Sequence, residues 1–579
     1  MRLKKTVTKN SISYYAIKSV TIDGKNTSRI VHKFGTHQQL REELGGQEPE
    51  VWVKQQIEKM NQAEDEENKD VLIRYAPNKV IPLDEQHAFQ CGYLFLQSIF
   101  YQLGLPQICK RISQDYKFEY DLQEILSSLI YGRMLFPASK KSTAEQAKVF
   151  LESPRFQLQD VYRALDVIAE SSDFIQAQLY KNSVKLHKRQ TGVLYYDCTN
   201  FFFEIDQAEG LKQYGLSKEH RPNPIVQLGL FMDADGIPLA FHLFEGNQNE
   251  QTTLKPLEKK IMKDFECAKF VVCTDAGLSS TENRLFNSMQ ERAFVTTQSV
   301  KKLKAFLKAW ALSPEGWSCQ GSKGTFNLSD LDEEKDKEKI FYKERWIKEN
   351  GLEQRLIVSF SLKYRQVQRA IRENQIESAL KNMKQGPAKV EKKNPKDYRR
   401  FIASIATTPG GEIADKKQLY LNEKQIAQEA LYDGFYAICT NLEDEVPEIL
   451  AINKRRWQIE DCFRILKQEF RSRPIYLQKD NRILSHFMTC FIALIIFRLF
   501  EQKVNLQREH FTASALIHTL RHMEFSHKPG EGYIPHYTRT KITDAVHGAF
   551  GFRTDYQIYT QKKCDKLIKE SKEIKYVSS

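Results

Sequence analysis

The sequence GVLYYDCTNFFFE, residues 192–204, marks an abrupt change along the chain. It is dense in aromatic and β-branched residues, which favour strands. Residues 86–190 before it instead place apolar residues at the three-to-four spacing of helices. Asp197 stands in the middle of this strand-forming run. An ionised carboxylate at such a position costs free energy unless it is paired, hydrogen-bonded or bound to a metal.

Four more strands are predicted downstream of this stretch. They are IVQLGLFMD (225–233), IPLAFHLFEG (237–246), KFVVCTDAG (269–277) and AFVTT (293–297), with a DADG turn joining the first two and helices on either side of the third. Three strands in a meander, a helix, a strand, a helix and a strand are the order of a ribonuclease-H-like fold. We therefore predict an α/β protein with a ribonuclease-H-like core.

The rest of the chain is predicted to be arranged around this core. A β-rich insertion domain interrupts the core, and a helical region precedes it. The predicted parts are an N-terminal β-hairpin and linker (1–75, with strands over 12–34 turning at Asp23-Gly24), a helical region (76–190), the first part of the core (191–300), the insertion (301–450), the final core helices (451–505) and a C-terminal region (506–579).

Composition narrows the class of protein. Lysine and arginine number 87 and acidic residues 74, a net charge of +13, which suits a polyanion-binding protein or a merely basic one equally. The ten cysteines form no CxxC pair, and the 13 histidines form no HExxH motif, so neither a zinc site nor a disulfide framework is indicated. No glycine-rich phosphate loop implies ATP.

Location is predicted to be cytoplasmic, without a membrane partner. The basic N-terminus lacks the apolar segment of a secretory signal. The longest apolar stretch, 487–500, is too short to span a bilayer and is predicted to be a buried helix.

Asp275 is the second notable carboxylate. It ends the apolar run FVVCT and precedes Ala276-Gly277, so it is expected at a strand end that opens into a crevice. For either aspartate alone, a purely structural role is the commoner explanation. The polar stretch GNQNEQTTLK (246–255) is interpreted as a plain loop entering a helix, although it could border the same crevice.

The third carboxylate, Glu460, lies in INKRRWQIEDCFRILKQEF (452–470), which is predicted to be one helix. One stripe is apolar and should pack inward: Ile459, Phe463, Leu466 and Phe470. The neighbouring stripe places three cations around the acid: Arg456, Glu460, Arg464 and Lys467. Ordinary helix salt bridges would explain this stripe, but it also suits a phosphate that approaches a metal.

Three acids of this kind suit phosphodiester cleavage. Two divalent cations, roughly 3.5–4 Å apart, need several hard oxygen ligands, and Asp and Glu supply them. The cations in turn offset the repulsion between clustered carboxylates. Strand-borne aspartates and a helix-borne glutamate fit this chemistry.

In these motifs the chain resembles the DDE transposases of bacterial insertion sequences, and more narrowly the group with a Tyr-x2-Arg-x3-Glu-x6-Lys signature. Arg456-x3-Glu460-x6-Lys467 has that spacing, and RWQIE (456–460) is similar to the family's R-W-x-I-E core. YYDCTNFFFE and CTDAGLSS match the contexts of its first and second aspartates. GLSKEHRP (215–222) resembles its G-x-S-K-[DE]-x-R loop. The likeness runs from about residue 120 to 505.

The resemblance implies that Asp197, Asp275 and Glu460 bind two Mg²⁺ ions, with Mn²⁺ as an alternative. It implies that Arg456 and Lys467 hold phosphates, with Lys218 and Arg221 as weaker candidates. Trp457 could stack on a base, or lie half-buried in the core. Relatives act as dimers on paired transposon ends, so a homodimer is expected that recognises terminal inverted repeats in double-stranded DNA and joins them to a target. The helical region 76–190 is the expected site of end recognition.

One position departs from the signature. Its tyrosine would fall at residue 453, where this chain has Asn453. Whatever that tyrosine contributes to holding DNA near the cut must be done differently, or by Tyr195 or Trp457. Two other functions compete with an active transposase: a nuclease or resolvase with the same core, and a non-catalytic DNA-binding descendant, which would be expected to have lost an acid.

Overall fold

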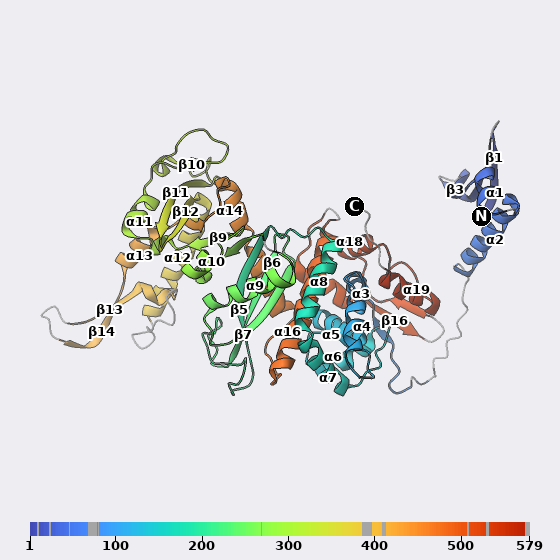
Figure 1. Ribbon diagram of the computed structural model, residues 1–579, viewed down its shortest axis with the longest axis horizontal. Coiled ribbons are helices and arrows are strands. Elements are labelled where there is room, and N and C mark those ends of the chain that lie inside the picture. The colour runs from blue at the N-terminus through green and yellow to red at the C-terminus, as the bar shows by residue number, and fades with distance from the viewer. Residues whose placement is uncertain are drawn as a thin grey trace. The chain divides into compact units, whose positions relative to one another are not determined.

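The computed structural model describes the chain apart from residues 9–10, 23–24, 46, 68–77, 79, 81, 268, 385–396, 408–412, 507–508, 529–531 and 574–579. The chain divides into two compact units. The first comprises Met1–Glu85 with Lys528–Glu531, and the second comprises Gln86–His527 with Gly532–Ser579. Figure 1 shows the elements of each.

The N-terminal unit is a small antiparallel sheet with two helices. Its longer strands pair in the antiparallel arrangement predicted for residues 12–34, whereas the turn predicted at Asp23-Gly24 lies outside the described residues. A compact apolar cluster holds the unit together: Tyr14, Ala16, Leu40, Val53 and Ile57. Its elements are β1 (Arg2–Val7), β2 (Ile12–Ile22), β3 (Lys25–Thr36), α1 (His37–Glu43) and α2 (Pro49–Glu67).

A nine-stranded mixed sheet is the centre of the second unit, in the order β10-β11-β12-β15-β9-β8-β5-β6-β7. Strand β5 pairs antiparallel with β6 and parallel with β8, and β8 pairs parallel with β9. The order β5-β6-β7-α9-β8-α10-β9 along the chain is the one predicted from the sequence. These elements are β5 (Val193–Phe202), β6 (Ile225–Asp233), β7 (Pro238–Glu245), α9 (Leu254–Asp264), β8 (Val271–Thr274), α10 (Thr281–Phe286) and β9 (Ala293–Gln298).

Four strands of the predicted insertion continue this same sheet. Strand β15 pairs antiparallel with β9, and β12, β11 and β10 follow outward. The pairing satisfies the backbone groups of β9, which would otherwise form an open edge. Strands β13 and β14 make a separate two-stranded sheet. The elements are α11 (Ala305–Leu312), β10 (Ser318–Cys319), β11 (Phe341–Glu349), β12 (Leu352–Phe360), α12 (Leu362–Met383), β13 (Ile402–Thr407), β14 (Ile413–Leu421), α13 (Glu423–Ala430) and β15 (Phe435–Thr440).

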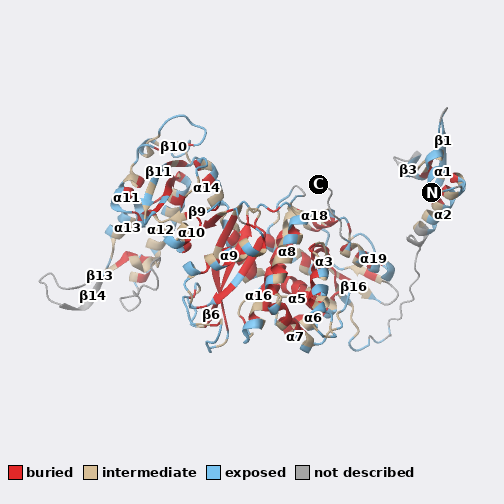
Figure 2. Ribbon diagram, in the orientation of Figure 1, coloured by how far each residue is buried: buried red, intermediate tan, exposed pale blue. Residues whose placement is uncertain are grey.

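Helices cover both faces of the sheet, and buried residues run through the strands and the helices packed on them (Figure 2). Helix α9 packs on one face, in a cluster that includes Tyr196. On the other face, which includes Tyr195, α16 packs against α3, α5 and α7. The helices before the core are α3 (Tyr93–Gln102), α4 (Leu105–Gln114), α5 (Leu122–Leu135), α6 (Lys140–Gln146), α7 (Leu158–Glu170) and α8 (Ser172–Leu186).

Helix α16 contains the apolar stretch 487–500 and is buried, as predicted. Among the described residues it is the one helix long and apolar enough to cross a membrane, but 89% of its apolar window lies inside the protein. All ten cysteines are free and buried. The remaining elements are β4 (Ala88–Gln90), α14 (Val446–Lys454), α15 (Trp457–Arg464), α16 (Asp480–Asn505), α17 (Ala513–His522), β16 (Glu524–Lys528), β17 (Gly532–Pro535), α18 (Lys541–Phe550) and α19 (Gln561–Lys572).

Candidate active site

Strand register brings the two aspartates together. In the parallel pair β5–β8, Tyr195 lies opposite Cys273. Two residues further along each strand, the same register places Asp197 beside Asp275. Side chains two residues apart on a strand share a face, so both aspartates lie on the face of Tyr195 and Cys273. The α15 residues Ile459, Cys462 and Phe463 pack on that face too.

Asp197 is the desolvated member of the pair. Its backbone lies within β5, and its Oδ1 accepts a hydrogen bond of 2.8 Å from the Cys198 amide. Burial raises the pKa of the Asp197 carboxyl to about 7, against the lowering effect of the Lys218 ammonium, and the charge of Asp275 raises it further. The two carboxylates therefore repel one another across the strands.

Asp275 directly follows β8 and lies where the chain turns. Its Oδ1 accepts hydrogen bonds from the amides of Gly277 (2.9 Å) and Leu278 (3.1 Å), so it caps the turn that follows the strand. The Thr296 hydroxyl donates to its backbone carbonyl at 3.2 Å. The structural role weighed for this residue is thus present, and it fixes the carboxylate beside Asp197.

Glu460 lies on a helix that is shorter than predicted. Helix α14 ends at Lys454 and α15 begins at Trp457, so the single helix predicted over 452–470 is wrong: it breaks at Arg455 and Arg456. Across the break, Arg456 Nη1 lies 3.2 Å from Glu460 Oε1, and the Glu460 side chain is 58% exposed. Glu460 therefore keeps an accessible oxygen.

A π-helix over Ile465–Glu469 follows α15 directly. Its wider turn is marked by the hydrogen bond of 2.9 Å from the Phe470 amide to the Ile465 carbonyl. The predicted inward stripe is confirmed, because all four of its apolar residues are buried: Ile459, Phe463, Leu466 and Phe470.

The predicted stripe of three cations around Glu460 is correct only for Arg456. Arg464 instead pairs with Asp461 at 2.5 Å on its own helix. Lys467, carried on the π-helix, has its Nζ 3.5 Å from Glu219. The change of helical pitch between positions 464 and 467 removes the common face that a regular helix would give them.

Arg456 connects the three acids. Burial alone would lower the pKa of its guanidinium, but the surrounding groups outweigh burial and raise it. Those groups are Tyr436, Glu460, Asp197 and Asp275. All three predicted acids thus act electrostatically on one cation.

Lys218 and Lys467 flank Asp197. Lys218 Nζ donates to the Cys198 carbonyl at 2.6 Å and lies 2.9 Å from Glu250. Burial lowers the pKa of Lys467 to about 8, and the charge of Lys218 lowers it further. The polar stretch 246–255 enters helix α9, as interpreted, and its Glu250 also brings it beside Lys218, the alternative that was left open.

Arg221 and Trp457 lie at the margin. The Arg221 guanidinium stacks over the Phe202 ring, with its centre 4.2 Å from the ring centroid. Trp457 is 57% exposed, which overturns the core alternative for this residue. Sequence reasoning missed Arg473, which pairs with Glu219 beside Lys467. No motif in the sequence around Arg473 indicated this contact.

Two arginines distant in sequence hold the end of the Glu460-bearing segment. Arg133 of α5 donates to the Phe470 carbonyl at 3.3 Å, and Arg521 of α17 donates to the Glu469 carbonyl at 2.7 Å. Free carbonyls at a helix end need such donors. The helical regions before and after the core therefore brace the segment that carries the third acid.

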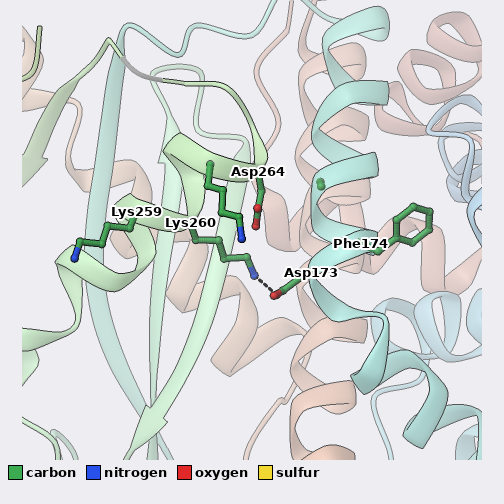
Figure 3. Close-up of a pocket in the computed structure, with 7 residues that line it drawn as sticks. Asp173, Phe174, Lys259, Lys260 and Asp264 are labelled. Atoms are coloured by element: carbon green, nitrogen blue, oxygen red, sulfur yellow. Dashed lines mark hydrogen bonds and ion pairs between the residues drawn. The ribbon is translucent and has the colours of Figure 1, made fainter.

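A separate pocket of about 590 Å³ lies between α8 and α9 and includes none of the predicted site residues. Figure 3 shows Lys260 reaching across from α9 to pair with Asp173 of α8. Its lining consists of Asp173, Phe174, Ala177, Lys259, Lys260, Lys263 and Asp264. Because Lys260 of α9 pairs with Asp173 of α8, this pocket is best explained as a contact between the two helices.

The three acids suit divalent cations, but they do not form a complete metal-binding site. Within the described part of the chain, no group of three or more His, Cys, Asp or Glu side chains is already clustered as metal ligands. The fit comes from electrostatics, because Asp197 is desolvated and faces a second carboxylate. Cations would offset both effects.

A family model for the transposase DDE domain matches residues 202–496, about half of the chain. The protein belongs to this family. It is a transposase, and Asp275 and Glu460 lie inside the matched range while Asp197 lies just before it. Transposases of the DDE class use divalent metal ions.

Comparisons with curated proteins and with solved structures do not extend the family assignment. No curated protein matches the transposase sequence. The cryo-EM structure of the piggyBac transposase synaptic complex with hairpin DNA is similar with a TM-score of 0.35 and 7% identity, over 75% of this chain and 78% of that chain. A likeness at this level does not define the fold.

Proposed function

We propose that this transposase cuts and joins DNA at the terminal inverted repeats of a bacterial insertion sequence, with Asp197, Asp275 and Glu460 as its catalytic metal ligands. The observation that carries the proposal is geometric: the parallel register of β5 and β8 places Asp197 beside Asp275, on the face where α15 packs with Glu460 3.2 Å from Arg456. A set of unrelated structural acids would not be expected to converge on one guanidinium at the end of two parallel strands.

The proposal includes a ribonuclease-H-like core. Its support is the strand order β9-β8-β5-β6-β7, with β5 central, an antiparallel meander on one side and parallel strands on the other. In this arrangement the aspartates of β5 and the end of β8 face a helix that follows the sheet in sequence. Strands β10, β11, β12 and β15 are then an insertion that extends the core sheet.

Asp197, Asp275 and Glu460 would hold two Mg²⁺ ions, or Mn²⁺. When bound, such ions activate an attacking oxygen and stabilise the leaving oxygen of the phosphodiester. The chain's own residues have other tasks. The carboxylate of Asp197 is held by the Cys198 amide within β5, and that of Asp275 is held by the turn after β8, whereas the exposed Glu460 would turn from Arg456 towards the aspartates.

The cations would bind the DNA backbone. Arg456 and Lys467 would hold phosphates beside the cut, which their electrostatic interaction with Asp197 supports, and Lys218 would assist them because it also acts on Asp197. Arg221, stacked on Phe202, would contact phosphates further along the strand. The exposed indole of Trp457 would stack on a base.

Double-stranded DNA is the proposed partner, with the helical region 76–190 as the site of end recognition. We further propose that the transposase acts in the cytoplasm as a homodimer, because paired ends must be brought together before they are joined. The net charge of +13 supports a polyanionic partner.

The test uses purified transposase, Mg²⁺ and DNA that carries the element's own ends, identified as inverted repeats bounded by short direct duplications beside the gene. Cut ends joined to target DNA are the expected products. Cutting without joining would instead identify a nuclease or resolvase. Specific binding without cutting would identify a non-catalytic descendant.

A further inference from the structure

Position 453 carries Asn453 where the family signature has a tyrosine, yet a tyrosine hydroxyl reaches this position from elsewhere. The Asn453 side-chain amide donates a hydrogen bond of 3.2 Å to the hydroxyl oxygen of Tyr436. Tyr436 belongs to β15, in the part of the sheet that the predicted insertion contributes. The chain therefore brings a phenolic hydroxyl to the same helix end by another route.

Strand β9 fixes this hydroxyl on its other side. The hydroxyl groups of Thr297 and Tyr436 lie 2.7 Å apart, and either can be the donor. The preceding residue, Thr296, bonds the backbone of Asp275. Tyr436 is thus tied to the strand next to the second aspartate as well as to the end of α14.

The partner of this hydroxyl is joined to Arg456, because the Asn453 carbonyl accepts a hydrogen bond of 3.2 Å from the Arg456 amide, and Tyr436 acts electrostatically on the guanidinium together with the three acids. A hydroxyl has one proton to donate and two lone pairs to accept. Asn453 occupies one lone pair, and Thr297 as donor occupies the other. The phenolic proton then remains for a phosphate oxygen held by Arg456.

A pocket of about 530 Å³ lies beside this contact, and both Tyr436 and Asn453 line it. A larger side chain at position 453 therefore has space to occupy. The Asn453 Oδ1 atom is buried without a hydrogen-bond partner among the described residues. Removing that acceptor relieves an unfavourable group.

We propose that Tyr436 is a positioning residue of the transposase, whose hydroxyl binds a phosphate oxygen of the DNA strand beside Arg456 and replaces the tyrosine missing at position 453. The inference rests on the proposed function. The other candidates do not fit this role, because Tyr195 is fully buried and its hydroxyl donates to the Ile452 carbonyl at 2.9 Å. Trp457 lacks a hydroxyl.

The test compares four proteins in single-turnover cleavage of end DNA, with DNA affinity measured separately. Tyr436→Phe keeps the ring and removes only the hydroxyl. We expect its cleavage rate to fall roughly ten- to a hundredfold, as for loss of a hydrogen bond to a charged group. Tyr364→Phe, which lines the same pocket, is the matched control and should cleave at the wild-type rate.

The fourth protein, Tyr436→Phe with Asn453→Tyr, returns a hydroxyl from the other side of the contact. Recovery of at least a tenth of the wild-type rate is expected, and a merely structural role for Tyr436 would not produce it. Wild-type cleavage by Tyr436→Phe, or no recovery in the double variant despite an unchanged Tm, overturns the inference. An inactive wild-type protein would instead refute the proposed function itself.

Discussion

Two desolvated acids on opposite faces of the central sheet have the same raised pKa and different surroundings. Asp197 of β5 faces the helices α15 and α16, and Glu258 of α9 lies on the other face. Burial raises the pKa of each to about 7. Glu258 accepts a hydrogen bond of 2.8 Å from the Asn287 amide. Asp197 faces a second carboxylate and the cations Lys218 and Arg456.

Desolvation therefore does not by itself identify a catalytic acid. Glu258 is completely buried and out of reach of a substrate. Asp197 lies beside Asp275 in the parallel register of β5 and β8, and both act with the exposed Glu460 on Arg456. A second acid and several cations around a desolvated carboxylate are what suit metal and phosphate.

The largest expected effect is that of Asp197→Asn. We expect DNA cleavage to fall on the order of a thousandfold or more, because the catalytic ions lose a carboxylate ligand. DNA affinity and Tm should stay near wild type, since the cations remain and the shape is conserved. Single-turnover cleavage beside a binding titration measures both.

Asp206→Asn is the matched control, because Asp206 lies exposed outside the site. It should cleave like wild type. If Asp197→Asn cleaved DNA at a rate comparable to that of Asp206→Asn, Asp197 would be a structural acid like Glu258. The contrast between the two acids would then disappear.

Glu258→Gln should change stability and leave cleavage intact. A carboxyl whose folded pKa is about 7, against the usual 4.5, holds its proton more tightly in the folded state. The folded state therefore loses stability as pH rises from about 4.5 to about 7, by about 3 kcal/mol in total. The glutamine variant lacks this loss, so at pH 8 it should be the more stable protein.

Denaturant unfolding at pH 4.5 and pH 8 checks the sign of this effect. The variant's advantage should be present at pH 8 and absent at pH 4.5. Glu209→Gln, an exposed acid, serves as control and should give no pH-dependent difference. An equal advantage at both pH values would show that packing, and not the charge of Glu258, is responsible.

Local patterns predicted much of what surrounds Asp197. The strands β5 to β9 and the inward stripe through Ile459 follow from residue periodicity, and each acid was identified by its place in such a pattern. Register is different, because the pairing of Tyr195 with Cys273 joins strands that are far apart in sequence. No local pattern determines it, so the closeness of the aspartates could only be inferred from the family resemblance.

The helix of Glu460 shows where a local sequence pattern predicts the wrong structure. Its sequence has an unbroken helical pattern, but the structure breaks at Arg455 and Arg456 and widens into a π-helix after Arg464. Contacts from Arg133 and Arg521 at its far end are tertiary, and sequence spacing carries no trace of them. The hydrogen bond between Asn453 and Tyr436 of β15 is likewise a tertiary contact that sequence spacing does not reveal.

Lys467→Ala tests the cations that surround Asp197. We expect about tenfold slower cleavage, and a salt dependence of DNA binding reduced by about one released counterion, because one phosphate contact is lost. Metal binding should be retained. Lys479→Ala removes an exposed lysine at the start of α16 and is the matched control. Equal effects of the two substitutions would place Lys467 in the general basic surface and outside the site.

The smallest expected effect concerns Glu219, which neutralises part of this basic surface. It pairs with Arg473, lies 3.5 Å from Lys467, and is 3.9 Å from Arg221. A DNA phosphate that binds these cations must compete with its carboxylate. Glu219→Gln should therefore bind DNA about two- to fivefold more tightly, the size of a partly exposed ion pair.

Titration of DNA binding against salt separates the two roles that Glu219 can have. Competition with phosphate predicts tighter binding and a steeper salt dependence in Glu219→Gln, because the freed cations release more counterions when DNA binds. Weaker binding with a shallower dependence would mean that Glu219 holds Lys467 and Arg473 in place for the phosphate. In that case Glu219 would orient neighbouring charged side chains, as the Asn287 amide orients the Glu258 carboxyl. The two faces of the sheet would then differ less than the surroundings of Asp197 and Glu258 imply.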